Sequence, residues 1–162
     1  MKHISFQAII NYIKHQFPGK DFIPLHAPVF IGNEKKYLID TIDSTFVSSV
    51  GAYVNKFEEM MCEITGAKHS VAIVNGTNAL HMGLILSDVN SNDEVLTQSL
   101  TFIATCNAIS YIGAKPVFID VDMDTLGMSP KSMSVYLSEN AEVRNDGYTY
   151  NKKSGRGIKA CV

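Results

Sequence analysis

The sequence has 162 residues, of which 46% are hydrophobic, and a formal net charge of −2. This composition is typical of a globular domain and excludes the low-hydrophobicity, high-charge regime of disordered chains. Because 14 Lys and Arg nearly balance 16 Asp and Glu, no global field favours nucleic acid or an anionic membrane as a partner. Small molecules and further copies of the chain are the expected partners.

The N-terminal segment from Met1 to Phe17 has charged residues between its apolar ones, so it lacks the continuous apolar region of a signal peptide. No stretch approaches the ~20 apolar residues that span a bilayer. The cysteines Cys62, Cys106 and Cys161 form no C-x-x-C pair and are odd in number. This argues against a disulfide framework and a zinc site, and we expect a cytoplasmic protein.

The first third of the chain has helical periodicity. The apolar spacing predicts helices over residues 4–17, 33–46 and 57–64. Pro18-Gly19 stops the first of them, Asn33 is the predicted N-cap of the second, and Gly66 closes the third. We take residues 1–32 as an N-terminal helix with an extended segment, and residues 33–162 as the beginning of a larger domain.

From residue 69 onward, short apolar runs alternate with helical segments. The predicted strands are residues 70–74, 94–97, 116–121 and 158–162, and the predicted helices are residues 78–86, 103–112 and 130–139. A turn at Asn145-Asp146-Gly147 indicates a small hairpin before the last strand. Strands separated by crossover helices are typical of a mostly parallel sheet, so the fold class is α/β.

The junction at Gly76-Thr77, where an apolar run meets the start of a helix, is the most informative position. Such a junction presents unpaired backbone N–H groups and the positive end of the helix dipole, and glycine lets an anion approach closely. A structural turn with an N-cap explains the same pattern equally well. The sequence has no G-x-G-x-x-G and no G-x-x-x-x-G-K-[ST], so dinucleotide and P-loop sites lose their main support.

Phe102 follows the strand predicted over residues 94–97. In a parallel sheet the loops at the carboxyl ends of the strands line one ligand crevice, so Phe102 and the Gly76 turn are expected at one cavity. The ring would cover a flat ligand there. The alternative is that Phe102 is a core residue, which is the more frequent role of such a side chain.

Three consecutive motifs resemble the DegT family of sugar aminotransferases, which are fold-type-I pyridoxal-phosphate enzymes. They are Gly76-Thr77-Asn78-Ala79-Leu80, Leu100-Thr101-Phe102 with its following residues, and Gly113 to Asp122. The resemblance covers roughly residues 23–130, and residues 23–51 are similar to the branch that acts on nucleotide-linked 4-keto sugars on the way to legionaminic acid or bacillosamine-type sugars. It implies a partial three-layer α/β/α large domain that is truncated at its C-terminus.

The resemblance also implies roles for individual residues. Gly76 and Thr77 bind the phosphate of pyridoxal phosphate with Asn78 nearby, Phe102 stacks on the pyridine ring, and the loop with Ser48, Ser49 and Gly51 borders the substrate pocket. The complete protein would be a homodimer that transfers an amino group, with glutamate as the expected donor.

The family's Schiff-base lysine, together with its Asp and Gln partners, comes later than the matched region. We therefore expect no catalytic residue within residues 1–162, and we expect Lys68, Lys115, Lys152, Lys153 and Lys159 to be solvated charges. The rival hypothesis is a non-catalytic remnant that binds at most a phosphate-bearing ligand or a partner chain.

Overall fold

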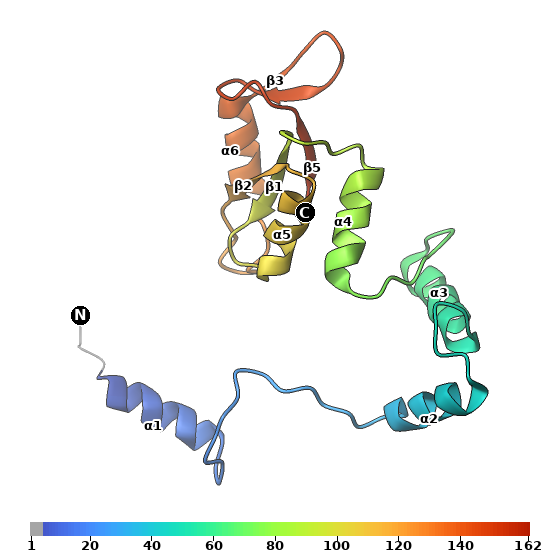
Figure 1. Ribbon diagram of the computed structural model, residues 1–162. Coiled ribbons are helices and arrows are strands. Elements are labelled where there is room, and N and C mark those ends of the chain that lie inside the picture. The colour runs from blue at the N-terminus through green and yellow to red at the C-terminus, as the bar shows by residue number, and fades with distance from the viewer. Residues whose placement is uncertain (1–4) are drawn as a thin grey trace. The chain divides into compact units, whose positions relative to one another are not determined.

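The structure is a computed structural model that describes residues 5–162. The chain divides into two compact units, with the boundary between Gly66 and Ala67 (Figure 1). The first unit includes the segment up to residue 32, and the proposed division between residues 32 and 33 stays a prediction. Within the described residues, no helix is both long and apolar enough to cross a bilayer.

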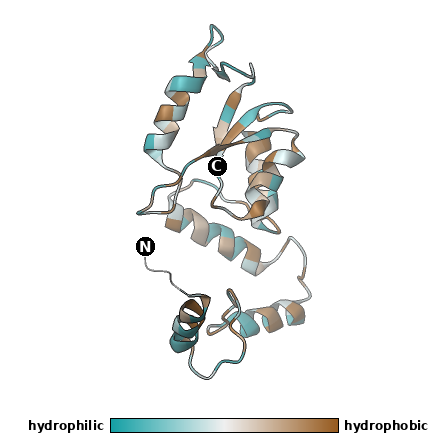
Figure 2. Ribbon diagram, turned by 90° about the vertical axis from the view of Figure 1, so that its left-hand side faces the viewer, coloured by the Kyte–Doolittle hydropathy of each residue, from teal (hydrophilic) through white to brown (hydrophobic). Residues whose placement is uncertain are grey.

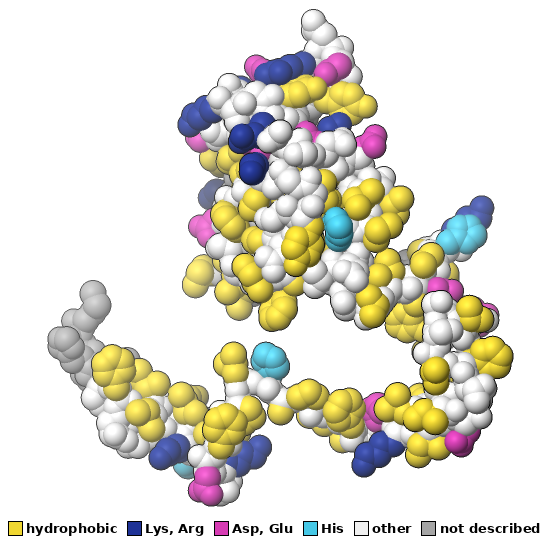
Figure 3. Space-filling model, viewed as in Figure 1, with side chains coloured by type: hydrophobic (Ala, Val, Ile, Leu, Met, Phe, Trp, Pro, Cys, Tyr) yellow, Lys and Arg dark blue, Asp and Glu magenta, His cyan; other side chains and the backbone are white. Residues whose placement is uncertain are grey.

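The first unit consists of three helices: α1 (Phe6–Gln16), α2 (Glu34–Ser44) and α3 (Ala52–Thr65). The hydroxyl of Ser5 caps α1 by accepting a hydrogen bond from the Ala8 N–H at 3.2 Å, and Gly66 ends α3 in the left-handed conformation. None of the three helices has a buried residue, and Figure 3 shows hydrophobic side chains along them in yellow.

One helix start in this unit matches the prediction and one differs from it. Asn33 occupies the N-cap position of α2, but its side chain makes no capping hydrogen bond. Helix α3 begins at Ala52 rather than near Phe57, because the chain turns into the helix directly at Gly51, whose carbonyl accepts from the Val54 N–H at 3.1 Å. The loop with Ser48 therefore leads straight into a helix N-terminus.

The second unit contains the predicted parallel sheet, with strand order β2-β1-β5. Its strands are β1 (Glu94–Gln98), β2 (Lys115–Ile119) and β5 (Ile158–Cys161), and its helices are α4 (Gly76–Leu86), α5 (Ile103–Tyr111) and α6 (Pro130–Asn140). Both pairings of β1 are parallel. An antiparallel hairpin of β3 (Ala141–Val143) and β4 (Thr149–Asn151) precedes β5, as the turn signal predicts.

Helices cover both faces of this sheet. On one face, Val95 packs in a buried cluster with Ala108 and Ile109 of α5 and Leu84 of α4. The adjacent residue Leu96 points to the other face, because side chains alternate along a strand, and it lines a cavity together with residues of α6. Hydrophobic residues, brown in Figure 2, occur in the strands and on α5. The arrangement confirms a partial α/β/α fold.

One predicted strand is wrong. Residues 70–74 form no strand, and Val71 and Val74 are 76% and 83% exposed. An apolar run of β-branched residues becomes a strand only where its backbone pairs with a neighbouring strand, and the described sheet of β2, β1 and β5 does not include it. The segment instead runs in extended form into α4.

The hairpin is anchored to the start of β1 by a buried carboxylate. Glu94 is 4% exposed, and its two oxygens accept hydrogen bonds from the Asn151 amide at 2.8 Å and the Ser154 hydroxyl at 2.7 Å. Burial raises the pKa of the neighbouring Tyr136, and the nearby Glu94 carboxylate adds to this effect. The two hydrogen bonds compensate for the burial of the Glu94 carboxylate, and they fix the hairpin at the amino end of the sheet.

Candidate functional site

A cavity of about 840 Å³ lies at the carboxyl end of the sheet, and three segments contribute to it. These segments are α4 along its whole length with Ser87 after it, the start of α5 with the residue before it, and the end of β5 with Val162. The residues that matter for its chemistry are Gly76, Thr77, Phe102, Thr105, Cys161 and Val162. The volume falls in the range of small-molecule and cofactor sites. The structure thus brings Gly76, Thr77 and Phe102 together at one cavity, as predicted, although residues 70–74 before Gly76 do not form the strand on which that prediction was based.

Two residues in the first turn of α4, Gly76 and Thr77, line this cavity and have unpaired backbone donors. The side chain of Asn75 accepts a hydrogen bond from the Asn78 N–H at 2.9 Å, and the Asn75 carbonyl accepts from the Ala79 N–H at 3.1 Å. The N–H groups of Gly76 and Thr77 have no acceptor within the described residues. Two unpaired donors at the positive end of a helix make a site for an anion.

The glycine at position 76 is not required by the fold. A Cβ atom built on Gly76 meets no atom within 4 Å, and the residue does not adopt a left-handed conformation. Glycine also lowers helix stability relative to alanine, by about 1 kcal/mol. The absence of a side chain therefore leaves open space beside the two donors.

Phe102 is not a core residue, so that alternative is wrong. The side chain is 77% exposed, and it occupies the N-cap position of α5, where its carbonyl accepts from the Thr105 N–H at 3.0 Å. Because the ring lines the same cavity as Gly76 and Thr77, it can cover the face of a flat ligand whose anionic group lies at α4.

Asn78 differs from its neighbours in the motif. It does not line the cavity, and its N–H is already bonded to the Asn75 side chain. The sequence did not identify Asn75 as the residue that caps α4. Nor did it identify Thr105, Cys161 and Val162 as residues that line the cavity. The position of Cys161 at the end of the last predicted strand was a signal for such a wall residue.

The predicted substrate loop lies in the first unit. Ser48 and Gly51 line a cavity of about 620 Å³ formed by α2, α3 and the loop between them, and Ser49 does not line it. The hydroxyl of Tyr53 donates to the Asp40 carboxylate at 2.9 Å and so connects α3 to α2. Desolvation and this hydrogen bond raise the pKa of Tyr53. The loop is thus held between two helices that are fixed to each other.

Two of the lysines that were predicted to be solvated, Lys152 and Lys159, have partners within the second unit. No lysine is among the described residues that line the 840 Å³ cavity. The ammonium of Lys152 donates to the carbonyls of Ser138 and Glu139, at the end of α6, and the ammonium of Lys159 lies 4.1 Å from the centre of the Tyr148 ring. Across residues 5–162, no three His, Cys, Asp or Glu residues are grouped so that they can hold a metal ion.

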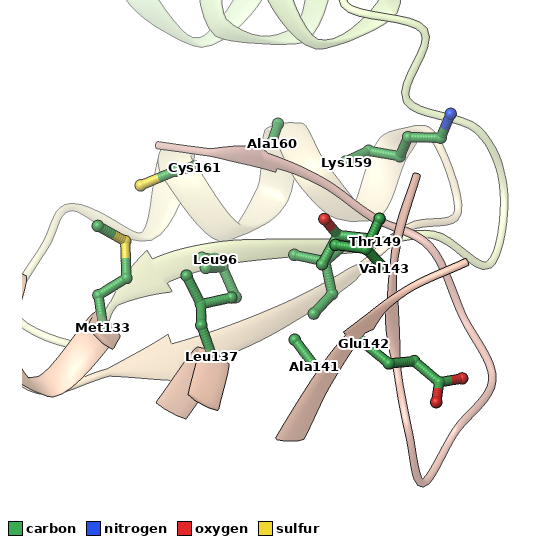
Figure 4. A pocket seen from close by; sticks show the side chains of 11 residues that line it. Leu96, Met133, Leu137, Ala141, Glu142, Val143, Thr149, Lys159, Ala160 and Cys161 are labelled. Carbon is green, nitrogen blue, oxygen red and sulfur yellow. The ribbon is translucent and has the colours of Figure 1, made fainter. Parts of the chain in front are cut away.

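A further cavity of about 470 Å³ lies between α6, the hairpin and β5 (Figure 4). Its interior is formed by Leu96, Met133 and Leu137, and the charged ends of Glu142 and Lys159 point away from these side chains in Figure 4. None of the predicted site residues lines it. Without convergent polar groups it offers no basis for catalysis.

The motifs around the 840 Å³ cavity fall within a known family. The model of the DegT/DnrJ/EryC1/StrS aminotransferase family matches residues 30–142, which is more than half of the chain. The chain belongs to this family. The match includes Gly76, Thr77 and Phe102 and confirms the resemblance that the sequence motifs indicated.

Curated and solved members of the DegT family support the assignment. The GDP-perosamine synthase of Escherichia coli O157:H7 is 42% identical over 108 residues, which are 67% of this chain and 30% of that protein. EpsN of Bacillus subtilis (strain 168), a candidate pyridoxal phosphate-dependent aminotransferase, is 41% identical over 117 residues, or 72% of this chain and 30% of that protein. A DegT DnrJ EryC1 StrS aminotransferase from Brucella abortus superposes with a TM-score of 0.64 at 29% identity, covering 80% of this chain and 32% of that one.

These comparisons confirm the fold and, at the level of the DegT family, the cofactor. The chain spans about 30% of the length of the curated relatives that it matches.

Proposed function

We propose that this chain forms the phosphate-binding and ring-stacking part of a pyridoxal-phosphate-dependent sugar aminotransferase. The observation that carries the proposal is the start of α4, where the N–H groups of Gly76 and Thr77 are unpaired and a Cβ at Gly76 would occupy open space. The fold gives no reason for this glycine, whereas a closely approaching phosphate does. The donor set thus fits the cofactor of the family.

Each residue has a separate task at this site. The N–H groups of Gly76 and Thr77 donate to the phosphate at the positive end of α4, and the Thr77 hydroxyl adds a further donor. Asn78 lies next in the same turn, and its N–H completes the helix cap. The exposed ring of Phe102 covers one face of the pyridine ring. When bound, pyridoxal phosphate supplies the electron sink through which an amino group is exchanged.

The substrate of the complete protein is a nucleotide-linked 4-keto sugar, and the amino donor is glutamate. The similarity to proteins named GDP-perosamine synthase supports a nucleotide-linked amino sugar as the product class. Ser48, Ser49 and Gly51 border the substrate pocket in this proposal, and the 620 Å³ cavity at Ser48 and Gly51 supports it. The legionaminic acid or bacillosamine branch and the homodimer rest on the sequence resemblance.

The rival function is a phosphate-binding protein without catalysis. Both functions use the same anion site, so an assay of cofactor binding tests that site but does not distinguish the two functions. An assay of amino transfer between glutamate and a nucleotide-linked keto sugar distinguishes them, because only the enzyme catalyses this reaction. The relatives' names favour the enzyme.

The test is a titration of the purified protein and its variants with pyridoxal phosphate, followed by absorbance. Gly76→Val places a side chain in the open space beside the donors, so it should abolish binding. Thr77→Ala removes one hydroxyl contact to a charged group and should cost about 1.5–3 kcal/mol of binding free energy. Thr77→Ser, which keeps the hydroxyl, is the matched control.

Circular dichroism and thermal unfolding check that each variant is folded. If Gly76→Val and Thr77→Ala both bind as tightly as the parent, the turn is only a helix cap and the proposed cofactor site is wrong.

A further inference from the structure

We propose that Asn75 is a positioning residue that keeps the phosphate site of α4 both open and uncharged. This inference rests on the proposed function, because it concerns how the anion is received at Gly76 and Thr77. It goes beyond that function by giving a role to a residue that lies outside the cavity wall.

The geometry of the first turn gives Asn75 this role. Its Oδ1 atom lies 2.9 Å from the Asn78 nitrogen, and its carbonyl lies 3.1 Å from the Ala79 nitrogen. Asn75 itself is extended, with φ −162° and ψ 166°. The residue therefore satisfies the third and fourth N–H groups of α4. The first two, at Gly76 and Thr77, are left for a ligand.

The uncharged amide of Asn75 is the second part of the argument. Asp caps a helix as well as Asn does, and the helix dipole favours its negative charge. A carboxylate at position 75 would, however, be bonded to the same turn that receives the phosphate, and two anions held that close repel each other. Asp at position 75 would therefore favour the helix cap but weaken phosphate binding. A neutral capping residue allows both the cap and the bound phosphate.

Asn75→Asp separates the two roles, and Asn75→Ser is its matched control because it is a neutral cap. The measurement is a titration of the ¹⁵N-labelled protein with pyridoxal phosphate, followed through the Gly76 and Thr77 amide signals. Pyridoxal, which lacks the phosphate, is the control ligand. Thermal unfolding without ligand reports on the cap.

We expect Asn75→Asp to unfold at the temperature of the parent or above it, and to bind pyridoxal phosphate about tenfold more weakly or worse. Its affinity for pyridoxal should not change. Asn75→Ser should match the parent in both measurements. The defect of Asn75→Asp should shrink in high salt, because salt screens repulsion at an exposed site but does not alter a cap.

Two results would overturn the inference, and they differ in what else they affect. If Asn75→Asp binds pyridoxal phosphate within twofold of the parent, Asn75 is only a helix cap, and the proposed cofactor site is untouched. If the amide signals of Gly76 and Thr77 in the parent protein do not respond to pyridoxal phosphate, the cofactor site itself is wrong, and the role of Asn75 fails with it.

Discussion

Replacing Phe102 with alanine should weaken the binding of pyridoxal phosphate and leave the fold nearly as stable as before. The side chain is 77% exposed, so only about a quarter of its surface, roughly 50 Å², is buried. At about 25 cal/mol per Å², its loss costs about 1 kcal/mol of the free energy of unfolding. A phenylalanine in the core would instead cost about 3–5 kcal/mol.

The same substitution removes the ring that, in the proposed function, covers the cofactor. An aromatic pair contributes about 0.5–1.5 kcal/mol beyond the burial of area, which corresponds to an affinity about 2- to 13-fold lower. Titration with pyridoxal phosphate measures the affinity, and thermal unfolding without ligand measures the stability. Phe118→Ala is the control, since Phe118 is also exposed but lies on β2 and does not line the cavity. An unchanged affinity together with a loss of 3 kcal/mol or more would refute the reasoning, because Phe102 would then stabilise the fold and not the bound cofactor.

Three further predictions address the lysines and the hairpin. Borohydride treatment in the presence of pyridoxal phosphate should label no single lysine stoichiometrically, because no lysine lines the cavity; mass spectrometry that finds one fully labelled lysine would contradict this. Ser154→Ala removes the hydroxyl that donates to the buried Glu94 carboxylate, so it should lower the free energy of unfolding in denaturant by about 1.5–3 kcal/mol. Ser138→Ala, at an exposed serine, should lower it by well under 1 kcal/mol. The Tyr148 N–H and, to a lesser degree, the Tyr150 hydroxyl lower the pKa of Asp146, so its carboxylate stabilises the hairpin at neutral pH, and this contribution is lost as the pH falls through the lowered pKa. Melting curves of Asp146→Asn should therefore differ slightly from the parent at neutral pH and converge with it in acid; an offset independent of pH would exclude the carboxylate as the cause.

Local signals predicted most of the second unit. Helix α6 begins at Pro130 as predicted, and the Ser129 hydroxyl caps it by accepting from the Ser132 N–H at 3.3 Å. The hairpin follows from its turn, where Gly147 has φ +81°. Such elements are predictable because the residues that determine them are neighbours in sequence. Residues 70–74 were mispredicted because a strand depends on a partner elsewhere in the chain, which a local pattern does not reveal.

Some features of the candidate site were likewise predictable from the local sequence, and others were not. Gly76 and Thr77 reach the cavity although residues 70–74 before them form no strand, but the position of Phe102 after β1 was predictable. The side-chain bond from Asn75 to the Asn78 N–H was not, because several polar residues near a helix start can serve as the cap. The wall contributed by Cys161 depends on how far β5 extends beside β1, which is a matter of register.

The choice between a phosphate site and a simple helix cap depends on how the features of α4 combine. A cap needs only an acceptor for an N–H group of the first turn, and the Asn75 side chain supplies it to the Asn78 N–H without any demand on Gly76. It does not need a glycine in the first helical position, where glycine lowers helix stability and where a side chain would meet no atom. Nor does it need an aromatic ring that is exposed to the same cavity at Phe102. A ligand with an anionic group and a flat ring accounts for both the glycine and the exposed ring, and pyridoxal phosphate, the cofactor named for the relative EpsN, has an anionic group and a flat ring.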